Sequence, residues 1–172
     1  MSRLEELIAE LCPEGVEYKN LENLCKTNTP PKKIPSNSIM DIGKYPVIDQ
    51  GAEFISGFTN DEQAILSQKE YIVFGDHTES IKFVDFAFAQ GADGIKILTS
   101  VNCDCKYLYY CFTNNYIKTG KYSRHWSNAK STLIPVPPLL VQEEIVRILD
   151  NFTELTAELT AELTAELAAR KK

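Results

Sequence analysis

The chain has 172 residues, a net charge of −6 and 44% hydrophobic residues, so it can build one globular domain and an appendage. It contains no apolar run long enough to cross a membrane, and its acidic, periodic N-terminus lacks the features of a signal peptide. Its five cysteines have no framework spacing, so we expect reduced thiols and a cytoplasmic protein without membrane contact.

The first hundred residues predict a short helix, a loop and a strand-rich region, in that order. Residues 3–11 carry apolar side chains on one helical face, and Pro13 and Gly15 end this short helix. Residues 28–38 contain three prolines and predict a loop. From Tyr45 to Ser100, short runs rich in Val, Ile, Phe and Tyr alternate with Gly, Asp and Asn, which predicts the strands of a mixed sheet.

The segment between Asp104 and Glu143 differs from the rest of this acidic chain. It holds five basic residues, seven aromatic residues and no carboxylate. Residues 105–116 predict a buried helix, and residues 119–131 predict a polar loop followed by an extended exit. A basic, acid-free, aromatic-rich segment indicates a surface that faces something negatively charged.

Apolar residues recur at three and four residues from Ile145 onward, and no Pro or Gly follows Pro138. One helix is therefore predicted from about Val141 to about Lys171, roughly 45 Å long at 1.5 Å per residue. We expect an α/β (α+β) protein with a mixed-sheet domain over residues 1–138 and a long helix over residues 139–172.

The long helix contains the tetrad Thr-Ala-Glu-Leu three times in succession. Each tetrad advances about 400°, so the leucine stripe drifts only about 40° per repeat and one partner helix can cover it. Because exposed leucines forgo about 1.5–3 kcal/mol each in burial, we expect a dimer interface. The expected interface residues are Phe152, Leu155, Leu159, Leu163 and Leu167.

The segment "IPVPPLLVQEEIVRILDNFTELTAELTAELTAEL" resembles the conserved region of the DNA-specificity subunit of type I restriction–modification systems. Upstream, "CPEGVEYKNL", "YPVIDQGAEFISGFTN", "YIVFGDHTESIKFVDFAFAQGADGIKIL" and "YSRHWS" look like the target recognition domain of that family. Such subunits carry two recognition domains and two antiparallel helices. This chain holds one of each, which implies a half subunit that pairs with a second copy.

The resemblance implies sequence-specific binding of double-stranded DNA without catalysis. A methylation subunit and, through it, a restriction subunit would carry out the chemistry. The residues agree, since no glycine-rich nucleotide loop is present and no cofactor is expected. Neither Asp76, His77 and Glu79 nor the Cys103 and Cys105 pair has further ligands at metal-binding spacing, so no metal is expected.

Candidate DNA contacts are polar and basic residues on the predicted loops and turns. Arg and Lys can bind guanine edges or phosphates, Asn can pair with adenine, and hydroxyl groups contact the backbone. Trp126 is expected to fill the core. The candidates in residues 120–131 are Lys121, Arg124, His125, Ser127, Asn128 and Lys130, and those elsewhere are His77, Thr78, Gln50, Lys32 and Lys33.

Two alternatives remain open at this stage. The chain could be a scaffold or decoy that pairs with specificity subunits through its helix and never reads DNA. It could also be a stand-alone enzyme, although no catalytic motif supports this. A DNA-binding assay with the methylation subunit distinguishes a scaffold or decoy from a subunit that reads DNA. An assay of methyl transfer or cleavage by the isolated chain tests the enzyme alternative.

Overall fold

The computed structural model describes residues 1–170 and divides the chain into two compact units. The α/β unit comprises residues 17–136, and the helical unit combines residues 1–16 with the residues from Pro137 onward. The N-terminal helix thus groups with the C-terminal helix, whereas the sequence placed it with the globular domain. No helix within residues 1–170 is both long and apolar enough to span a bilayer.

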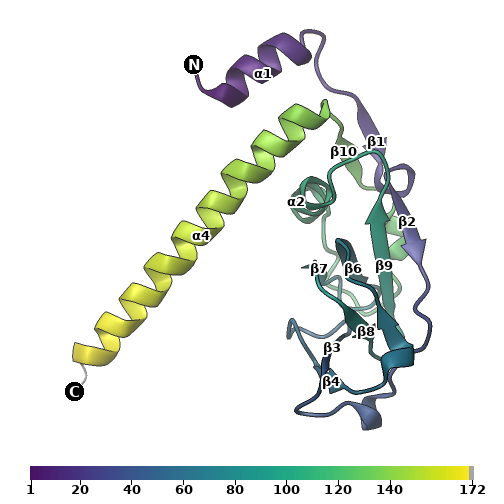
Figure 1. The fold of residues 1–172 in the computed structure, drawn as a ribbon. Coiled ribbons are helices and arrows are strands. Elements are labelled where there is room, and N and C mark those ends of the chain that lie inside the picture. The colour runs from purple at the N-terminus through teal and green to yellow at the C-terminus, as the bar shows by residue number, and fades with distance from the viewer. Residues whose placement is uncertain (171–172) are drawn as a thin grey trace. The chain divides into compact units, whose positions relative to one another are not determined.

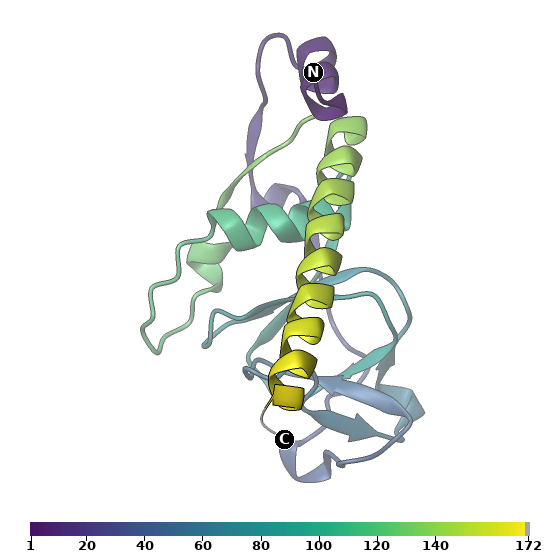
Figure 2. The same ribbon diagram turned by 90° about the vertical axis from the view of Figure 1, so that its left-hand side faces the viewer.

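The helical unit contains α1 (Arg3–Leu11) and α4 (Leu139–Arg170). Ser2 begins α1 with a capping box, in which Ser2 Oγ accepts a hydrogen bond from Glu5 N and Glu5 returns one to Ser2 N. The 32 residues of α4 form an uninterrupted helix about 48 Å long (Figures 1 and 2). Both helices were predicted, and the last residue predicted for α4, Lys171, lies outside the described residues.

An ionic cluster joins the two helices of this unit. The Glu144 side chain is 5% exposed and accepts two hydrogen bonds from Arg147, at 2.8 and 2.6 Å. Arg3 Nε of α1 lies 3.7 Å from the same carboxylate. The hydrogen bond from Arg147 lowers the pKa of Glu144, so the carboxylate stays charged between two guanidinium groups.

The tetrad region of α4 is exposed at every described position from Asn151 onward. Its four leucines at 155, 159, 163 and 167 are 55–58% exposed, and Phe152 is 65% exposed. The threonines are satisfied within the helix, because each hydroxyl donates to the carbonyl four residues earlier at 2.7–2.9 Å. These threonines are Thr153, Thr156, Thr160 and Thr164.

The α/β unit contains three sheets (Figure 1). Strands were predicted over residues 45–100, and the strands at residues 18–20 and 25–28 lie outside that prediction. A two-stranded sheet pairs β1 (Tyr18–Asn20) with β10 (Leu133–Pro135). The first four-stranded sheet is antiparallel in the order β2 (Cys25–Asn28), β9 (Ile95–Ser100), β6 (Tyr71–Gly75), β7 (Ile81–Val84). The second is mixed, in the order β4 (Gly57–Thr59), β3 (Tyr45–Ile48), β8 (Phe88–Gln90), β5 (Ile65–Leu66). Short 3-10 helices span Leu21–Asn23 (η1), Ser36–Ser38 (η2) and Glu62–Ala64 (η3).

Two apolar clusters hold these layers together. One combines Ile72, Phe74 and Leu98 of the first sheet with Leu108 and Phe112 of α2 (Cys105–Asn115). The other joins Tyr71, Val73 and Ile97 of the first sheet to Ile48 and Phe88 of the second. The first sheet is therefore covered on both faces, which explains the continuous apolar run of β6.

The polar segment 119–131 was predicted as a loop, and the structure places a short helix, α3 (Trp126–Ala129), within it. Trp126 begins this helix and packs beside Phe74, with ring centroids 6.0 Å apart. The sequence missed α3 because four residues are too few to show helical periodicity.

Candidate nucleic-acid interface

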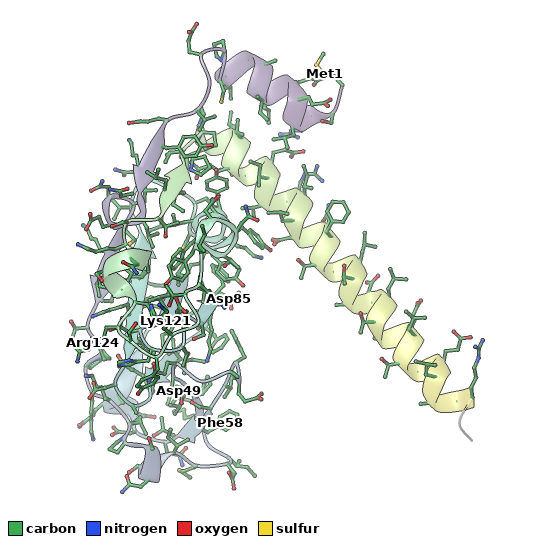
Figure 3. The ribbon with its side chains drawn as sticks, turned by 180° about the vertical axis from the view of Figure 1, so that it is seen from behind. Met1, Asp49, Phe58, Asp85, Lys121 and Arg124 are labelled. Carbon is green, nitrogen blue, oxygen red and sulfur yellow. The ribbon has the colours of Figure 1, made fainter. Side chains whose placement is uncertain are left out.

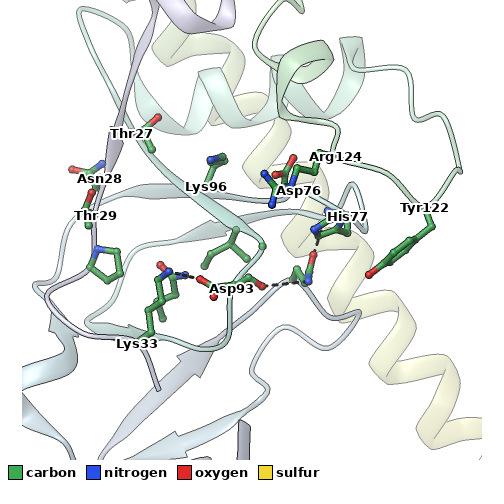
Figure 4. Close-up of a pocket in the computed structure, with 15 residues that line it drawn as sticks. Thr27, Asn28, Thr29, Lys33, Asp76, His77, Asp93, Lys96, Tyr122 and Arg124 are labelled. Atoms are coloured by element: carbon green, nitrogen blue, oxygen red, sulfur yellow. Dashed lines mark hydrogen bonds and ion pairs between the residues drawn. The ribbon is translucent and has the colours of Figure 1, made fainter. Parts of the chain in front are cut away.

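Five segments that are distant in sequence meet around one groove of the α/β unit (Figure 4). They are the segments that follow β2, β3, β6 and β8, together with the loop between α2 and α3. The groove has a volume of about 510 Å³ and a mostly polar lining that includes Asn28, Gln50, His77, Asp93 and Arg124. Four of the predicted DNA contacts line it, namely Lys33, Gln50, His77 and Arg124.

Glu79, in the turn between β6 and β7, anchors the loop between α2 and α3. This carboxylate is 3% exposed and accepts hydrogen bonds from Thr119 N at 2.8 Å, Gly120 N at 2.9 Å and the Tyr116 hydroxyl at 2.7 Å. Burial raises the pKa of Glu79, but these hydrogen bonds and nearby His125 outweigh it and lower the pKa to about 2. The loop is thus attached to the sheet by a buried charge.

Asp76 and His125 form a second attachment between the turn that follows β6 and the loop between α2 and α3. Asp76 Oδ1 accepts hydrogen bonds from the backbone N–H groups of His125 at 3.0 Å and Trp126 at 2.8 Å. His125 is 1% exposed, with Nδ1 3.4 Å from Glu79 Oε1 and Nε2 2.6 Å from the Lys121 carbonyl oxygen. His125, expected to contact DNA, is therefore buried, and its ring instead positions the loop that carries Lys121.

Replacing Glu79 with glutamine should destabilise the α/β unit by about 1–3 kcal/mol at neutral pH, because buried N–H donors lose their charged acceptor. The folded-state pKa of about 2 lies below the ordinary value of 4.5, so the carboxylate stabilises the fold above about pH 4.5. That contribution is lost as the pH falls toward 2. Denaturant titrations of both proteins across this range should show their stability difference shrinking with acidity.

Glu62→Gln is the matched control, because Glu62 is an exposed carboxylate whose hydrogen bond to Lys44 also lowers its pKa. An exposed pair adds little to stability, so this variant should unfold almost as the parent does. A stability difference for Glu79→Gln that stays constant with pH would show that its charge does not hold the loop.

Three of the predicted DNA-contacting lysines already have carboxylate partners. Each ammonium group lies within ion-pair distance of an Asp or Glu on another segment, and all three pairs are at least partly exposed. Such exposed ion pairs are weak, so each lysine can leave its carboxylate to bind a phosphate. Without DNA, however, the positive charge of each lysine is neutralised by its partner. The pairs are Lys32–Asp61, Lys33–Asp93 and Lys130–Glu22.

Arg124 and Lys96 differ from these lysines, because neither side chain has an ion-pair or hydrogen-bond partner within residues 1–170. Both line the groove (Figure 4). Lys96 lies on β9, which is bonded to β2 and β6 on its two sides, so its backbone is rigid. Sequence reasoning missed Lys96, although a lysine between Ile95 and Ile97 in a buried strand was a usable signal.

The remaining predicted residues lie around the groove or outside it. Gln50 Oε1 accepts a hydrogen bond from His77 N at 3.3 Å, and the Gln50 carbonyl accepts one from the Thr78 hydroxyl at 2.6 Å. These bonds bring the three polar residues of the strand turns together. The structure does not bring Lys121, Ser127 and Asn128 into the groove; Lys121 is exposed on the same loop as Arg124 (Figure 3), and the other two are exposed on α3.

Within residues 1–170, no group of three or more His, Cys, Asp or Glu side chains is arranged to hold a metal ion. The carboxylates of Asp76 and Glu79 are engaged by the loop. Burial raises the pKa of the Cys103 thiol to about 12 and that of Cys105 to about 11, so both thiols stay protonated at neutral pH.

Comparison with known proteins gives concordant matches. A family model described as "Type I restriction modification DNA specificity domain" matches residues 13–169. The specificity subunit of the type I restriction enzyme EcoR124I/EcoR124II from Escherichia coli is 38% identical over 91% of this chain, which spans 42% of that subunit.

Solved structures agree in fold. The type I restriction–modification S subunit from M. genitalium matches 86% of this chain and 41% of its own with a TM-score of 0.66 at 19% identity. The HsdS subunit from Thermoanaerobacter tengcongensis matches 92% of this chain and 44% of its own with a TM-score of 0.58 at 18% identity. This chain therefore spans less than half the length of the relatives it matches.

Proposed function

The chain belongs to the type I restriction–modification DNA specificity family, and we propose that it binds a specific sequence in double-stranded DNA. Specificity subunits of these systems recognise DNA and are not catalytic. The observation that carries the proposal is the convergence of five segments on a groove where, within residues 1–170, the side chains of Arg124 and Lys96 have no ion-pair or hydrogen-bond partner. Cations on a loop and on the central strand β9 that have no partner within residues 1–170 are suited to phosphates and guanine edges.

We further propose that the α/β unit is a target recognition domain and that the helical unit serves assembly. The exposed leucines of α4 favour pairing with the helix of a second copy in an antiparallel, two-fold arrangement. A methylation subunit would bind this dimer and modify adenines in the target, and a restriction subunit would join through it. We place this assembly in the cytoplasm, where its DNA substrate is accessible.

The proposal is tested by reconstituting the chain with a methylation subunit and mapping the adenines that become methylated in random-sequence DNA. A symmetric dimer should give an interrupted palindrome, because both recognition units are identical. Methylation without sequence preference, or a target with no inverted repeat, would contradict the proposal.

Arg124→Ala should weaken binding to the specific target by about 1–3 kcal/mol if the guanidinium group contacts a guanine. Lys96→Gln should also weaken binding to the specific target. Lys130→Ala is the matched control, since its ammonium group pairs with Glu22, and it should weaken binding less. Binding titrations with specific and unrelated duplexes over a range of salt concentrations measure these effects.

A loss that is equal for all sequences, with a shallower salt dependence, would assign Arg124 to phosphate contact. Unchanged affinity in both Arg124→Ala and Lys96→Gln would place the DNA-binding surface elsewhere.

A further inference from the structure

Tyr122 lies at the edge of the groove in an unusual state, because its side chain is 89% exposed although its ring is held in a stack. The ring lies nearly parallel to that of His77, with centroids 5.3 Å apart and an interplanar angle of 20° (Figure 4). One face of the tyrosine is thus backed by the imidazole, and its high exposure leaves the other face open. An aromatic ring in this state offers a platform for another planar ring.

The size of the groove restricts the kind of ligand that can reach this platform. Its volume of about 510 Å³ falls in the range of pockets that hold one small molecule. A double helix is too wide to enter, since its major groove alone is about 12 Å across. A single base turned out of the duplex can enter a pocket of this size.

The chemistry of the lining favours a neutral, polar ligand over a bare anion. Lys33 is neutralised by Asp93, and Asp76 adds a second carboxylate that would repel a phosphate. Lys96 and Arg124 supply donors that have no partner in the described part of the chain, residues 1–170. The edge of a nucleobase, which mixes acceptors with donors, matches this lining better than a phosphate does.

Two further groups at the platform are incompletely satisfied. The Gln50 side-chain amide makes two long hydrogen bonds, 3.4 Å to the Asp93 carbonyl and 3.3 Å from His77 N, so it can turn toward a ligand. Within residues 1–170, His77 Nδ1 is a buried side-chain atom without a hydrogen-bond partner. Such atoms are rare in folded proteins and call for a specific explanation.

We propose that the groove receives one nucleobase displaced from the DNA duplex, which stacks on Tyr122 while Lys96, Arg124 and Gln50 bind its edge. This inference rests on the proposed function, because it requires a duplex bound at this face. It adds a base-binding site to a surface that would otherwise read a paired duplex from outside.

The test uses the full chain in complex with its methylation subunit and a set of duplexes derived from the specific target. In each duplex one base of the target keeps its identity while its partner is changed to a mismatch. Unpaired bases are cheaper to displace, so a mismatch at the captured position should tighten binding by about tenfold or more. An abasic site at the same position should weaken it.

Tyr122→Ala should lose both effects and bind the fully paired target about 5- to 150-fold more weakly, the range expected for one base–aromatic stack. Tyr122→Phe keeps the ring and should keep both effects. Tyr18→Ala is the matched control, because Tyr18 is a 61% exposed tyrosine on β1 outside the groove, and it should behave as the parent.

The inference fails if the parent prefers its target but no mismatch tightens binding, or if the gain persists in Tyr122→Ala. If a mismatch at the methylated adenine still tightens binding in Tyr122→Ala, the displaced base is bound by the methylation subunit. That result also contradicts the inference. If the parent shows no sequence preference for any duplex, the proposed function itself fails, and the two failures are distinguishable.

Discussion

A chain in which Leu159 and Leu163 are both replaced by lysine should be a monomer at concentrations where the parent is a dimer. Each leucine is 58% exposed in the single chain, and burying one against a partner contributes about 1.5–3 kcal/mol. The two substitutions remove four such contacts from a two-fold dimer and add four positive charges at its centre. The dissociation constant should therefore rise by at least about ten-thousand-fold.

Light scattering over a range of concentrations measures this effect. Ala157→Lys with Ala161→Lys is the matched control, because each alanine lies about 200° around the helix from the leucine two residues later. It adds the same charge to the same helix, and lysine is as good a helix former as leucine. A monomeric parent at micromolar concentration, or a control that dissociates equally, would rule out pairing through the leucine stripe.

The second large effect should follow from deleting one tetrad, Thr160 to Leu163. The deletion removes about 6 Å of helix and rotates the remainder by about 40°, while every loop of the α/β unit stays unchanged. If paired α4 helices set the distance between two recognition units, each half-site should be retained. The spacer between the half-sites should shorten by roughly one or two base pairs at about 3.4 Å each.

Methylation across a panel of targets that differ only in spacer length measures this change. Replacing the same tetrad with four alanines is the control, because it keeps the length and helical propensity but removes one leucine. That variant should keep the original spacer with weaker assembly. If the deletion variant prefers the original spacer at full affinity, α4 does not set the distance between the two recognition units. If the variant reads different bases within each half-site, the surface that reads DNA is not confined to the loops of the α/β unit.

The helices α1, α2 and α4 were predictable from the sequence because their signals are local. The apolar spacing of α1 lies within nine residues, and α4 has no Pro or Gly to interrupt it. The strands within residues 45–100 were also evident from their composition, whereas β1 and β2 were not predicted. The order of the strands was not, because the parallel pairing of β3 with β8 depends on packing between residues that are about forty positions apart.

The candidate site was only partly predictable for the same reason. Lys33, Gln50, His77 and Arg124 were named from residue type, but their common groove results from tertiary structure. The sequence could not distinguish Arg124 from its neighbour His125, since a one-residue step in this loop separates an exposed side chain from one that is 1% exposed. It also could not show that Lys32, Lys33 and Lys130 are paired with carboxylates on distant segments.

The threonine hydrogen bonds of α4 have a consequence for how two such helices could align. The threonine hydroxyl of each tetrad donates to the carbonyl four residues earlier in the same helix, and each tetrad presents the same leucine and glutamate as the next. A slide of four residues therefore leaves nearly the same chemistry in contact. The repeat alone therefore permits several almost isoenergetic alignments. Selection among them must come from residues that occur once. Phe152, an exposed aromatic residue four positions before Thr156, is such a residue. Its packing against the partner helix can select one register among alignments that the repeat leaves equivalent.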